Sequence, residues 1–547
     1  MVHDTPIRLK HKSPLNAAEF ESLLTDYPNP DFPELLTGII QFGARIGYSG
    51  DATPSHQQNH SSATNDPAVI QSDIDKDLEL HRLHELDHLP SGHFCSPLGL
   101  VPKASNGVQT GWRRIFDLSS PTGASVNDGI DPQYGELKYE TFDMALQEIA
   151  RLGKGTRMLK RDLKSAFRYI PVCSQDHHLL TFEWNGKWYV DLFLPFGLRT
   201  APFIFNLFAE ALHWIMEEHH GWILHHYLDD FIAFFPPGRD LTPAGDQFAN
   251  ICGRLGFQVA EDKNTEGTVV DYLGITIDSD KMEARLPPDK KDRVLREVTA
   301  LLRKKTVGQG DLQSILGFLT FCTRVFPLGR PFLRHLFNML HCQSRYQRLT
   351  LAARRDLEWW RTLLPIWSGI STIAPARHQT TIATDASGKK GIGGVWFATM
   401  DMFSTRMPRR HRSKHINYKE MHAVLHAFAH WGDNWKGHLV EVQCDNEAVV
   451  AGINKKTIRG AAIGPLQHLL LLAAILDVDI RATWIPSEEN ALADALSRFE
   501  MKKVAQLTGQ ENVSLPSRQA SLIAEKISRL KQDITSTTAP RPNTTAG

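Results

Sequence analysis

The chain has 547 residues, enough for about three to four domains. Hydrophobic residues make up 42% and charged residues 22%, which is ordinary for a soluble globular protein. The 61 Lys and Arg residues balance the 61 Asp and Glu residues, so only local clusters of charge can indicate a nucleic-acid partner.

Neither the N-terminus nor the cysteines indicate secretion. Met1 to Lys12 has no apolar segment of the signal-peptide type. The most apolar run, Leu469 to Leu476, is too short to span a bilayer and predicts a buried helix face, so no membrane partner is expected. The scattered cysteines argue against a disulfide framework or zinc site and favour a reducing intracellular location, cytoplasm or nucleus: Cys95, Cys173, Cys252, Cys322, Cys342 and Cys444.

The N-terminal third begins as a polar extension and becomes mixed α/β. Residues 1–78 are expected to form a partly disordered extension, in which Ser49 to Asp66 reads as loop or disorder. Leu98 to Lys103 and Trp112 to Leu118 have the composition of paired strands. Phe142 to Arg151 is predicted to be helical.

The next segment alternates strands and helices. Arg157 to Tyr169 passes from a strand into a short helix, and Leu179 to Phe193 predicts two strands around the turn Asn185-Gly186. Ala201 to Glu218 has the apolar spacing of a helix. The apolar segments on either side of Tyr227-Leu228-Asp229-Asp230 predict a hairpin with the two acids near its tip.

The C-terminal half divides into a helical segment and a second α/β unit. A helix is expected over Gln247 to Leu255, followed by strands at Gln258-Val259 and Asp271 to Ile277. Asp289 to Trp367 reads as mostly helical and basic on one face. A new unit from Thr380 to Phe499 is predicted to run strand, turn, strand, helix, strand, helix, helix, strand, helix.

The sequence also predicts a glycine-rich turn and a disordered C-terminal tail. Gly388 to Gly394 is expected to be the turn between the first two strands of this unit, because it lacks the ending of a phosphate-binding loop. Thr535 to Gly547 is rich in Thr and Pro and is expected to be disordered.

Asp229 and Asp230 are adjacent carboxylates at the tip of the predicted hairpin. Consecutive strand residues point to opposite faces, so the two cannot both lie in one apolar core. An isolated pair would be a solvated turn, and Asp162 alone could be a helix N-cap. Carboxylates from neighbouring strands can instead hold the two Mg²⁺ ions, about 3.5–4 Å apart, that nucleotidyl transfer requires.

Five segments resemble motifs A to E of reverse transcriptases, in the order of that family. They are Asp162–Arg168, Leu194–Asn206, Tyr227–Asp230, Leu255–Phe257 with Lys263, and Tyr272–Gly274. Ser96–Lys103 and Trp112–Leu118 resemble the fingers hairpin of the same family. The resemblance implies a right-hand polymerase of fingers, palm and thumb, with a multidomain α/β and α+β fold.

The resemblance also implies a role for each residue that matches a motif. Asp162 and Asp229 would bind both Mg²⁺ ions, for which Mn²⁺ can substitute, with Asp230 assisting and the Leu163 carbonyl completing one coordination shell. Phe167 falls at the steric gate of the family, where its ring would exclude a ribose 2′-hydroxyl. The residues implied to contact the nucleotide are Lys103, Arg113, Leu163, Phe167, Phe196, Gly197 and Lys263. Strand alternation lets only one of Arg113 and Arg114 face the triphosphate.

Within the family, the chain most resembles DIRS-type retrotransposon polymerases, the group with a tyrosine recombinase. The wording of Leu194–Pro202, the segment Ser119–Asp128 and the stretch Gly43–Gly50 carry this resemblance. Gypsy-type elements share mainly the first of these.

A second set of four carboxylates lies in the C-terminal α/β unit. Asp385, Glu420, Asp445 and Asp494 lie on separate predicted elements and would repel one another unless metal neutralised them. Their order, with Trp484-Ile485-Pro486 before the last helix, resembles ribonuclease H, where four acids hold two Mg²⁺. Many ribonucleases H carry a His on the loop before the last acid, whereas this chain has Trp484 to Ser487.

A basic cluster precedes Glu420. It could hold the backbone of a hybrid or be a solvated loop, and it comprises Arg406, Arg409, Arg410, Arg412 and Lys414.

The resulting prediction is a reverse transcriptase with an attached ribonuclease H. Its domains are the extension 1–78, fingers and palm 79–278, thumb and connection 279–370, the ribonuclease H-like unit 378–500 and a partly disordered tail 501–547. The implied partners are an RNA template, a DNA primer, an RNA–DNA hybrid and deoxynucleoside triphosphates. One alternative is a decayed or domesticated protein that binds nucleic acid without catalysis. Another, an RNA-dependent RNA polymerase, does not account for Phe167 or the second α/β unit.

Overall fold

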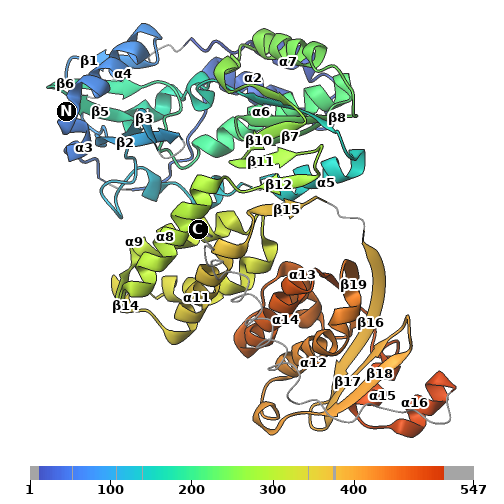
Figure 1. Cartoon of the computed structure of the whole chain (residues 1–547). Coiled ribbons are helices and arrows are strands. Elements are labelled where there is room, and N and C mark those ends of the chain that lie inside the picture. Colours follow the sequence, from blue (N-terminus) through green and yellow to red (C-terminus); the bar gives the residue numbers. More distant parts are fainter. Residues whose placement is uncertain are drawn as a thin grey trace, which may run out of the picture. The chain divides into compact units, whose positions relative to one another are not determined.

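A computed structural model of the chain describes residues 12–51, 53–105, 108–137, 139–342, 344–373 and 377–509. The chain divides into two compact units, Met1–Ala284 and Arg285–Gly547 (Figure 1). The expectation for Thr535 to Gly547 lies outside the described residues. Among the described residues no single helix has the length and apolar composition to cross a membrane, although the bent pair Glu447–Lys455 and Gly460–Ile475 meets both criteria together.

The first unit alternates helices with short strands. Its helices are α1 (Ala17–Leu23), α2 (Asp31–Phe42), α3 (Ser61–Asn65), α4 (Pro67–Glu79), α5 (Phe142–Leu152), α6 (Ala201–His220) and α7 (Thr242–Leu255), with 3₁₀ turns η1 (Asn127–Gly129), η2 (Pro132–Gly135), η3 (Ala166–Tyr169), η4 (Ser174–Leu179) and η5 (Glu261–Lys263). Its strands are β1 (Leu83–Leu86), β2 (Leu98–Ser105), β3 (Val108–Phe116), β4 (Arg157–Asp162), β5 (Thr181–Trp184), β6 (Lys187–Asp191), β7 (Ile223–Tyr227), β8 (Asp230–Phe235), β9 (Thr265–Gly267), β10 (Val269–Tyr272) and β11 (Ile275–Asp278), with β12 (Glu283–Arg285) at the boundary.

A four-stranded sheet in the order β7-β8-β4-β9 forms the centre of this unit. The strands β7 and β8 pair as an antiparallel hairpin, and β8 pairs antiparallel with β4. Helix α6 packs against β7, and its apolar positions Phe205, Phe208 and Leu212 are fully buried. The predicted hairpin and the helix predicted from Ala201 are therefore confirmed.

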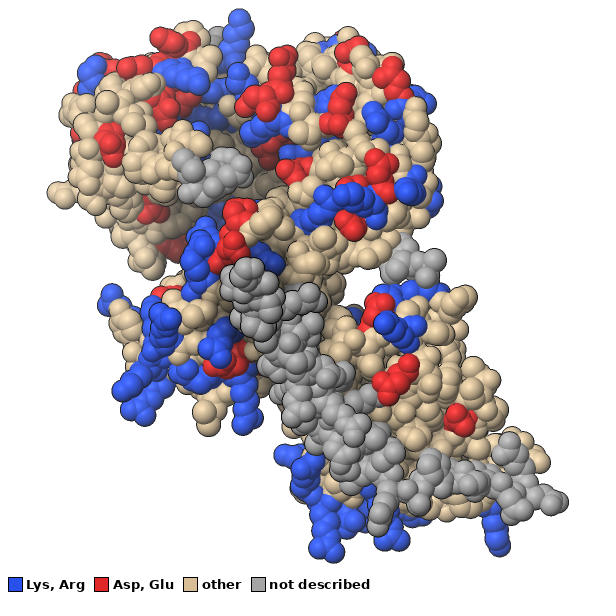
Figure 2. Space-filling model, viewed as in Figure 1, with Lys and Arg blue, Asp and Glu red and all other residues tan. Residues whose placement is uncertain are grey.

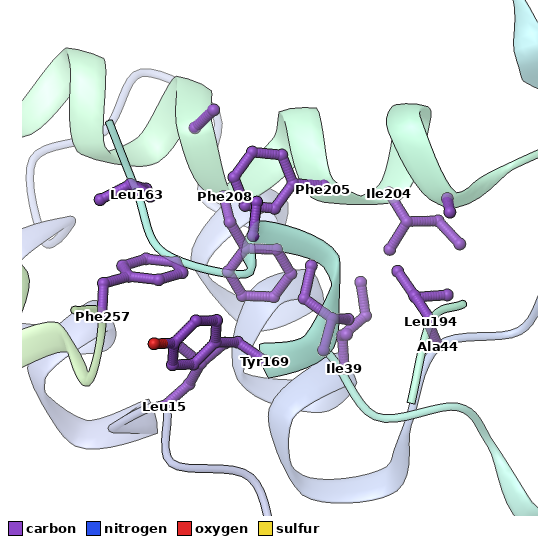
Figure 3. Packing of buried hydrophobic residues seen from close by; sticks show 14 of the residues in the cluster. Leu15, Ile39, Ala44, Leu163, Tyr169, Leu194, Ile204, Phe205, Phe208 and Phe257 are labelled. Carbon is purple, nitrogen blue, oxygen red and sulfur yellow. The ribbon is translucent and has the colours of Figure 1, made fainter. Parts of the chain in front are cut away.

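The N-terminal segment belongs to the core of the first unit. Phe20 is fully buried, with ring centroids 5.5 Å from Phe208 and 6.2 Å from Phe257. Figure 3 shows Leu15 beside Tyr169 and Phe257. Gly256 has φ +93°, and a Cβ there would lie 2.1 Å from the Pro14 carbonyl oxygen, so this glycine lets the N-terminal segment cross close to the backbone.

The structure of the first unit corrects two predictions made from the sequence. The segment Ser49 to Asp66 is not simply loop, because it contains α3, and the backbone N–H of Leu98 donates to the Asn59 side chain at 2.7 Å. The predicted strand from Leu179 starts at Thr181, because η4 continues to Leu179. The hairpins β2–β3 and β5–β6 form as predicted.

The second unit starts with a helical part. It comprises α8 (Pro288–Arg303), α9 (Gln309–Cys322), η6 (Pro327–Leu333), α10 (Arg334–Leu340) and α11 (Leu351–Ile366), with short strands β13 (Thr306–Gly308), β14 (Tyr346–Arg348) and β15 (Ile370–Thr372). Lys and Arg side chains gather over these helices (Figure 2). The Arg293 guanidinium lies over the Phe318 ring at 4.1 Å. The predicted helical, basic segment is confirmed, although the strands within it were not predicted.

The remainder of this unit is a five-stranded sheet in the order β18-β17-β16-β19-β20. Its elements are β16 (His378–Ala386), β17 (Gly391–Trp396), β18 (Asp401–Arg406), η7 (Arg409–His411), α12 (Ile416–Trp431), η8 (Gly432–Trp435), β19 (His438–Cys444), α13 (Glu447–Lys455), η9 (Gly460–Ala462), α14 (Ile463–Ile475), β20 (Asp479–Trp484), α15 (Ala491–Ser497) and α16 (Met501–Thr508). Strands β16, β19 and β20 are parallel, and β17 and β18 are antiparallel to their neighbours.

Two details of this sheet differ from the prediction. Strand β18 was not predicted, because a short edge strand gives a weak hydrophobic pattern. Gly391 to Gly394 belong to β17 rather than to a turn. At Gly393 a Cβ would lie 2.5 Å from the Ser497 backbone nitrogen, so the glycine permits close packing of α15 on the sheet.

Candidate active sites

The β7–β8 hairpin carries two of the three predicted polymerase carboxylates. Tyr227 pairs with Asp230, so Leu228 and Asp229 form the turn. Leu228 has φ +55°, a left-handed conformation that costs energy for a branched residue and is common at functional sites. Asp230 lies directly opposite Asp162 of β4 in the antiparallel register. The fold therefore brings Asp162 together with two acids that lie more than sixty residues later in the sequence.

Backbone hydrogen bonds fix the positions of these acids. The Leu163 N–H donates to the Asp229 carbonyl at 3.0 Å, and the Ala260 N–H donates to the Asp162 carbonyl at 2.8 Å. The turn is thus bonded to the end of β4, and the end of β4 is bonded to the segment before Lys263. Motifs A, C and D meet at one edge of the sheet.

The three carboxylates are crowded and poorly solvated. Burial, with the charge of Asp162, raises the pKa of Asp229. Burial also raises the pKa of Asp230, to about 6, against the opposing effect of Lys160, whose Nζ lies 3.4 Å from its Oδ1. Lys263 donates to Asp162 at 2.8 Å; burial lowers the pKa of Lys263, but this bond and the charges of Asp162 and Asp229 together raise it. Lys160 and Lys263 therefore offset part of the negative charge of the three acids.

Motif B is attached to the segment Ser119–Asp128 through one buried amide. The Asn127 side chain donates to the Gly197 carbonyl at 2.8 Å and accepts from the Arg199 N–H at 2.8 Å. Gly197 has φ +113°, and a Cβ there would lie 2.2 Å from the Phe116 carbonyl oxygen. Only glycine fits this position without displacing β3.

Aromatic side chains pack around Phe167 of motif A. The Phe167 ring, half-buried on η3, lies 5.2 Å from Phe196 and 5.6 Å from Phe205. The Arg113 guanidinium lies 5.9 Å from the Phe196 ring, whereas Arg114 donates to Asp77 at 2.6 Å. The two arginines thus point to different places, and Arg113 is the exposed one. Lys103 is exposed on β2, and no hydrogen bond or ion pair among the described residues joins it to the acids.

A buried ionic cluster next to motif A was not predicted. Arg168 is 6% exposed and donates to Asp191 at 2.7 and 2.8 Å and to Asp77 at 3.1 Å. Asp77 also pairs with Arg82 and Arg114. Because its members come from five separate segments, no local pattern in the sequence indicated the cluster.

The second set of carboxylates also converges. Asp385 lies in the last two residues of β16, Glu420 lies on α12 and Asp445 follows β19, which pairs with β16. Burial raises the pKa of Asp385 to about 6, and burial with the charges of Asp385 and Asp445 raises the pKa of Glu420 well above its usual range. Asp494, on α15, contributes its charge to both shifts.

This second site fits a bound cation. Asp385 Oδ2 and Glu420 Oε2 are buried and accept no hydrogen bond within the described structure. Ligand atoms of Glu420, Cys444 and Asp445 lie within 4.8 Å of one another. Buried carboxylate oxygens without donors are costly unless a proton or a metal cation binds them.

Polar contacts hold the other two acids at the rim. Ser487 donates to Asp445 Oδ2 at 2.7 Å, and Arg498 donates to Asp494 Oδ1 at 2.6 Å. Ser487 lies on the loop between β20 and α15. The basic cluster before Glu420 is exposed, on and around η7.

The central sheet, its carboxylate hairpin and the helices packed on it define a polymerase-like fold. Residues 108–277 match the family model described as "Reverse transcriptase (RNA-dependent DNA polymerase)".

Proteins from retrotransposons are similar to this chain. The retrovirus-related Pol polyprotein from transposon gypsy of Drosophila melanogaster is 32% identical over 133 residues, which cover 24% of this chain and 13% of that protein. The Pol polyprotein from transposon opus of the same species is 25% identical over 528 residues, 89% of this chain and 48% of that protein. The chain spans less than half the length of these curated relatives. A solved foamy viral protease-reverse transcriptase in complex with dsDNA has a TM-score of 0.48 at 19% identity, covering 88% of this chain and 99% of that chain.

Proposed function

We propose that this chain is a retrotransposon RNA-directed DNA polymerase that also cleaves the RNA strand of RNA–DNA hybrids. The observation that carries the polymerase assignment is the register of the central sheet. It sets Asp162 opposite Asp230, with Asp229 in the adjoining turn. The match of residues 108–277 to the reverse transcriptase family supports the same assignment.

At the polymerase site, Asp162, Asp229 and Asp230 would hold two Mg²⁺, with the Leu163 carbonyl as a further ligand. Bound Mg²⁺ supplies activation of the primer 3′-hydroxyl and neutralises charge on the triphosphate. Lys263 and Lys160 lie beside the acids and would offset the charge of the incoming nucleotide.

The nucleotide would be held by donors and rings around the acids. Arg113, which is not engaged by Asp77, offers a planar fork of donors to phosphate oxygens. Phe167, packed on Phe196 and Phe205, would occupy the space of a ribose 2′-hydroxyl and select deoxynucleotides. Lys103 and the Gly197 backbone would complete the contacts.

At the second site, Asp385, Glu420, Asp445 and Asp494 would hold two Mg²⁺ for hydrolysis of the RNA strand. The donorless oxygens of Asp385 and Glu420 support this role. The exposed basic residues around η7 would bind the hybrid backbone by charge neutralisation. Affiliation with DIRS-type elements remains a prediction that rests on Ser119–Asp128 and Gly43–Gly50.

Extension of a DNA primer on an RNA template with Mg²⁺ and deoxynucleotides tests the polymerase assignment. We expect extension by the wild type and none by Asp229→Asn, which keeps the side-chain shape but removes the charge. Asp246→Asn, an exposed position on α7, is the matched control and should extend normally. A folded wild type that extends no primer would overturn the assignment and favour the non-catalytic scaffold.

Hybrid cleavage tests the second site separately. Asp385→Asn should stop cleavage of the RNA strand and leave primer extension unchanged, and Asp401→Asn, exposed on β18, should change neither activity. Loss of both activities in Asp385→Asn would contradict two independent sites.

Sugar selection tests the position given to Phe167. Phe167→Ala should raise incorporation of ribonucleotides relative to deoxynucleotides, because it removes the ring. An unchanged ratio in a folded variant would show that another group selects the sugar.

A further inference from the structure

Two histidines, one on α6 and one on the β7–β8 hairpin, face each other through their Nδ1 atoms. His213, on α6, and His226, on β7, place their Nδ1 atoms 2.8 Å apart. His226 is 4% exposed and His213 is 9% exposed, so water does not separate the rings. The Nδ1–Nδ1 contact must contain a proton or a cation, because two lone pairs cannot meet at this distance.

The surroundings of the two Nε2 atoms indicate whether a proton or a metal cation lies between the Nδ1 atoms. His213 Nε2 lies 3.1 Å from Glu217 Oε1, and His226 Nε2 lies 3.7 Å from Glu210 Oε1. The Glu217 carboxylate favours a proton on His213 Nε2, and the charge of Glu210, beyond hydrogen-bond distance, favours one on His226 Nε2; with both protons in place, both Nδ1 atoms are bare lone pairs. Carboxylates that orient a histidine from its outer nitrogen are the usual second layer of a metal site. With both Nε2 atoms protonated, a further proton between the Nδ1 atoms would make one ring a cation, which burial disfavours.

A third ligand completes the set from a different segment. Ligand atoms of Glu140, His213 and His226 all lie within 4.8 Å of one another, with Glu140 Oε2 3.9 Å from His226 Nδ1. The carboxylate of Glu140 is held in place, because it accepts from the His226 backbone N–H at 2.6 Å and lies 3.0 Å from His225 Nδ1. Each oxygen retains a lone pair for a further partner.

The ligand types and spacing select a class of metal. Two imidazoles and one carboxylate suit Zn²⁺ and other late transition metals rather than Mg²⁺. Two nitrogens at about 2.0–2.1 Å from a tetrahedral Zn²⁺ lie about 3.3 Å apart, so the rings need to separate by about half an ångström. The scattered cysteines had argued against a zinc site; these ligands contain no sulfur.

We propose that Glu140, His213 and His226 bind one Zn²⁺ that joins α6 and the segment before α5 to β7. Tyr139, next to Glu140, stacks on Tyr227, next to His226, at 4.3 Å between ring centroids. The ion would therefore hold the strand that leads directly into the Asp229 turn. Binding at this site does not depend on either proposed activity.

Metal content of the full chain tests the site. Protein stripped with a chelator, reloaded with Zn²⁺ and desalted would be analysed for zinc per chain. We expect His213→Gln, His226→Gln and Glu140→Gln each to hold one zinc fewer than the wild type. His84→Gln, exposed on β1, should match the wild type. Equal zinc in all five proteins would overturn the proposal and leave a shared proton between the rings.

A spectroscopic measurement keeps the test decisive if the variants do not fold. The zinc X-ray absorption spectrum of the loaded wild type should contain two imidazole ligands and no sulfur. Co²⁺ in place of Zn²⁺ should give the visible absorption of a tetrahedral site. A zinc spectrum with sulfur or without imidazole would place the metal elsewhere, for example at Glu420, Cys444 and Asp445, and would refute the assignment.

Discussion

Replacing Asp191 with Asn should destabilise the first unit far more than an ordinary charge removal. The substitution keeps the size of the side chain but removes one of the two negative charges in the buried cluster. Arg82, Arg114 and Arg168 would then share Asp77 alone. Arg168 is 6% exposed and loses the charged partner of two hydrogen bonds of 2.7 and 2.8 Å.

The size of the effect follows from the partners that remain. Leaving one member of a buried ion pair without its partner costs about 3–5 kcal/mol. Arg168 keeps Asp77 at 3.1 Å and the carbonyls of Phe193 and Leu194, so the lower end of that range, about 3 kcal/mol, applies. At about 2–4 °C for each kcal/mol in domains of this size, the unfolding temperature should fall by at least about 6 °C.

Calorimetry with hydrogen exchange would measure this loss. Protection should fall in α4, β3 and η3, which carry the cluster, and stay unchanged in β16–β20. Glu148→Gln removes an exposed pair with Arg151 and should cost no more than about 0.5 kcal/mol. Burial raises the pKa of Asp191 against the effect of Arg168. A loss as small as that of the control would therefore mean that Asp191 is already uncharged, and would refute the reasoning.

Three further outcomes are expected. Gly197→Ala should raise the KM for deoxynucleotides in primer extension, because its Cβ would lie 2.2 Å from the Phe116 carbonyl oxygen. Gly253→Ala, whose Cβ would have no atom within 4 Å, should leave the KM unchanged. Equal effects of the two substitutions would contradict the packing argument. In metal-free protein the pKa of Asp230 is raised from 3.8 to about 6, so the folded chain binds the carboxyl proton of Asp230 more tightly than the unfolded chain does. The stabilisation that this bound proton provides is therefore lost as pH rises from 3.8 to about 6. Asp230→Asn should therefore gain melting temperature relative to the wild type between about pH 4 and pH 7, and a constant difference would disprove the shift. Ser487→Ala removes the donor at 2.7 Å from Asp445 and should slow hybrid cleavage about 10-fold or more with primer extension unchanged; full cleavage activity would exclude a positioning role.

Local patterns predicted the parts of the molecule whose determinants are close in sequence. The hairpin around Asp229 and the helix α6 follow from apolar spacing and β-branched residues, and both are confirmed. The motif order correctly placed Asp162, Asp229 and Asp230 on adjoining elements, because the register of β4 and β8 is set by the same apolar alternation.

The parts that were missed depend on partners far apart in sequence. The cluster around Arg168 joins residues from Asp77 to Asp191, and the His213–His226 contact needs α6 to pack on β7 at a particular rotation. The short strand β18 and the glycines of β17 were misassigned because edge position and close packing of α15 are tertiary properties.

Leu15 and Phe20 lie outside the family match but are buried against Tyr169, Phe208 and Phe257 within it. The segment that matches the family is therefore not the same as the segment that forms the folded unit. The stretch related to known reverse transcriptases, residues 108–277, lacks the side chains that fill its own interior. Cut to those limits, the polypeptide would expose several large apolar surfaces to water, and aggregation would be the expected fate. The family match covers about a third of the sequence, whereas the interior of that stretch is filled in part by helices that precede it.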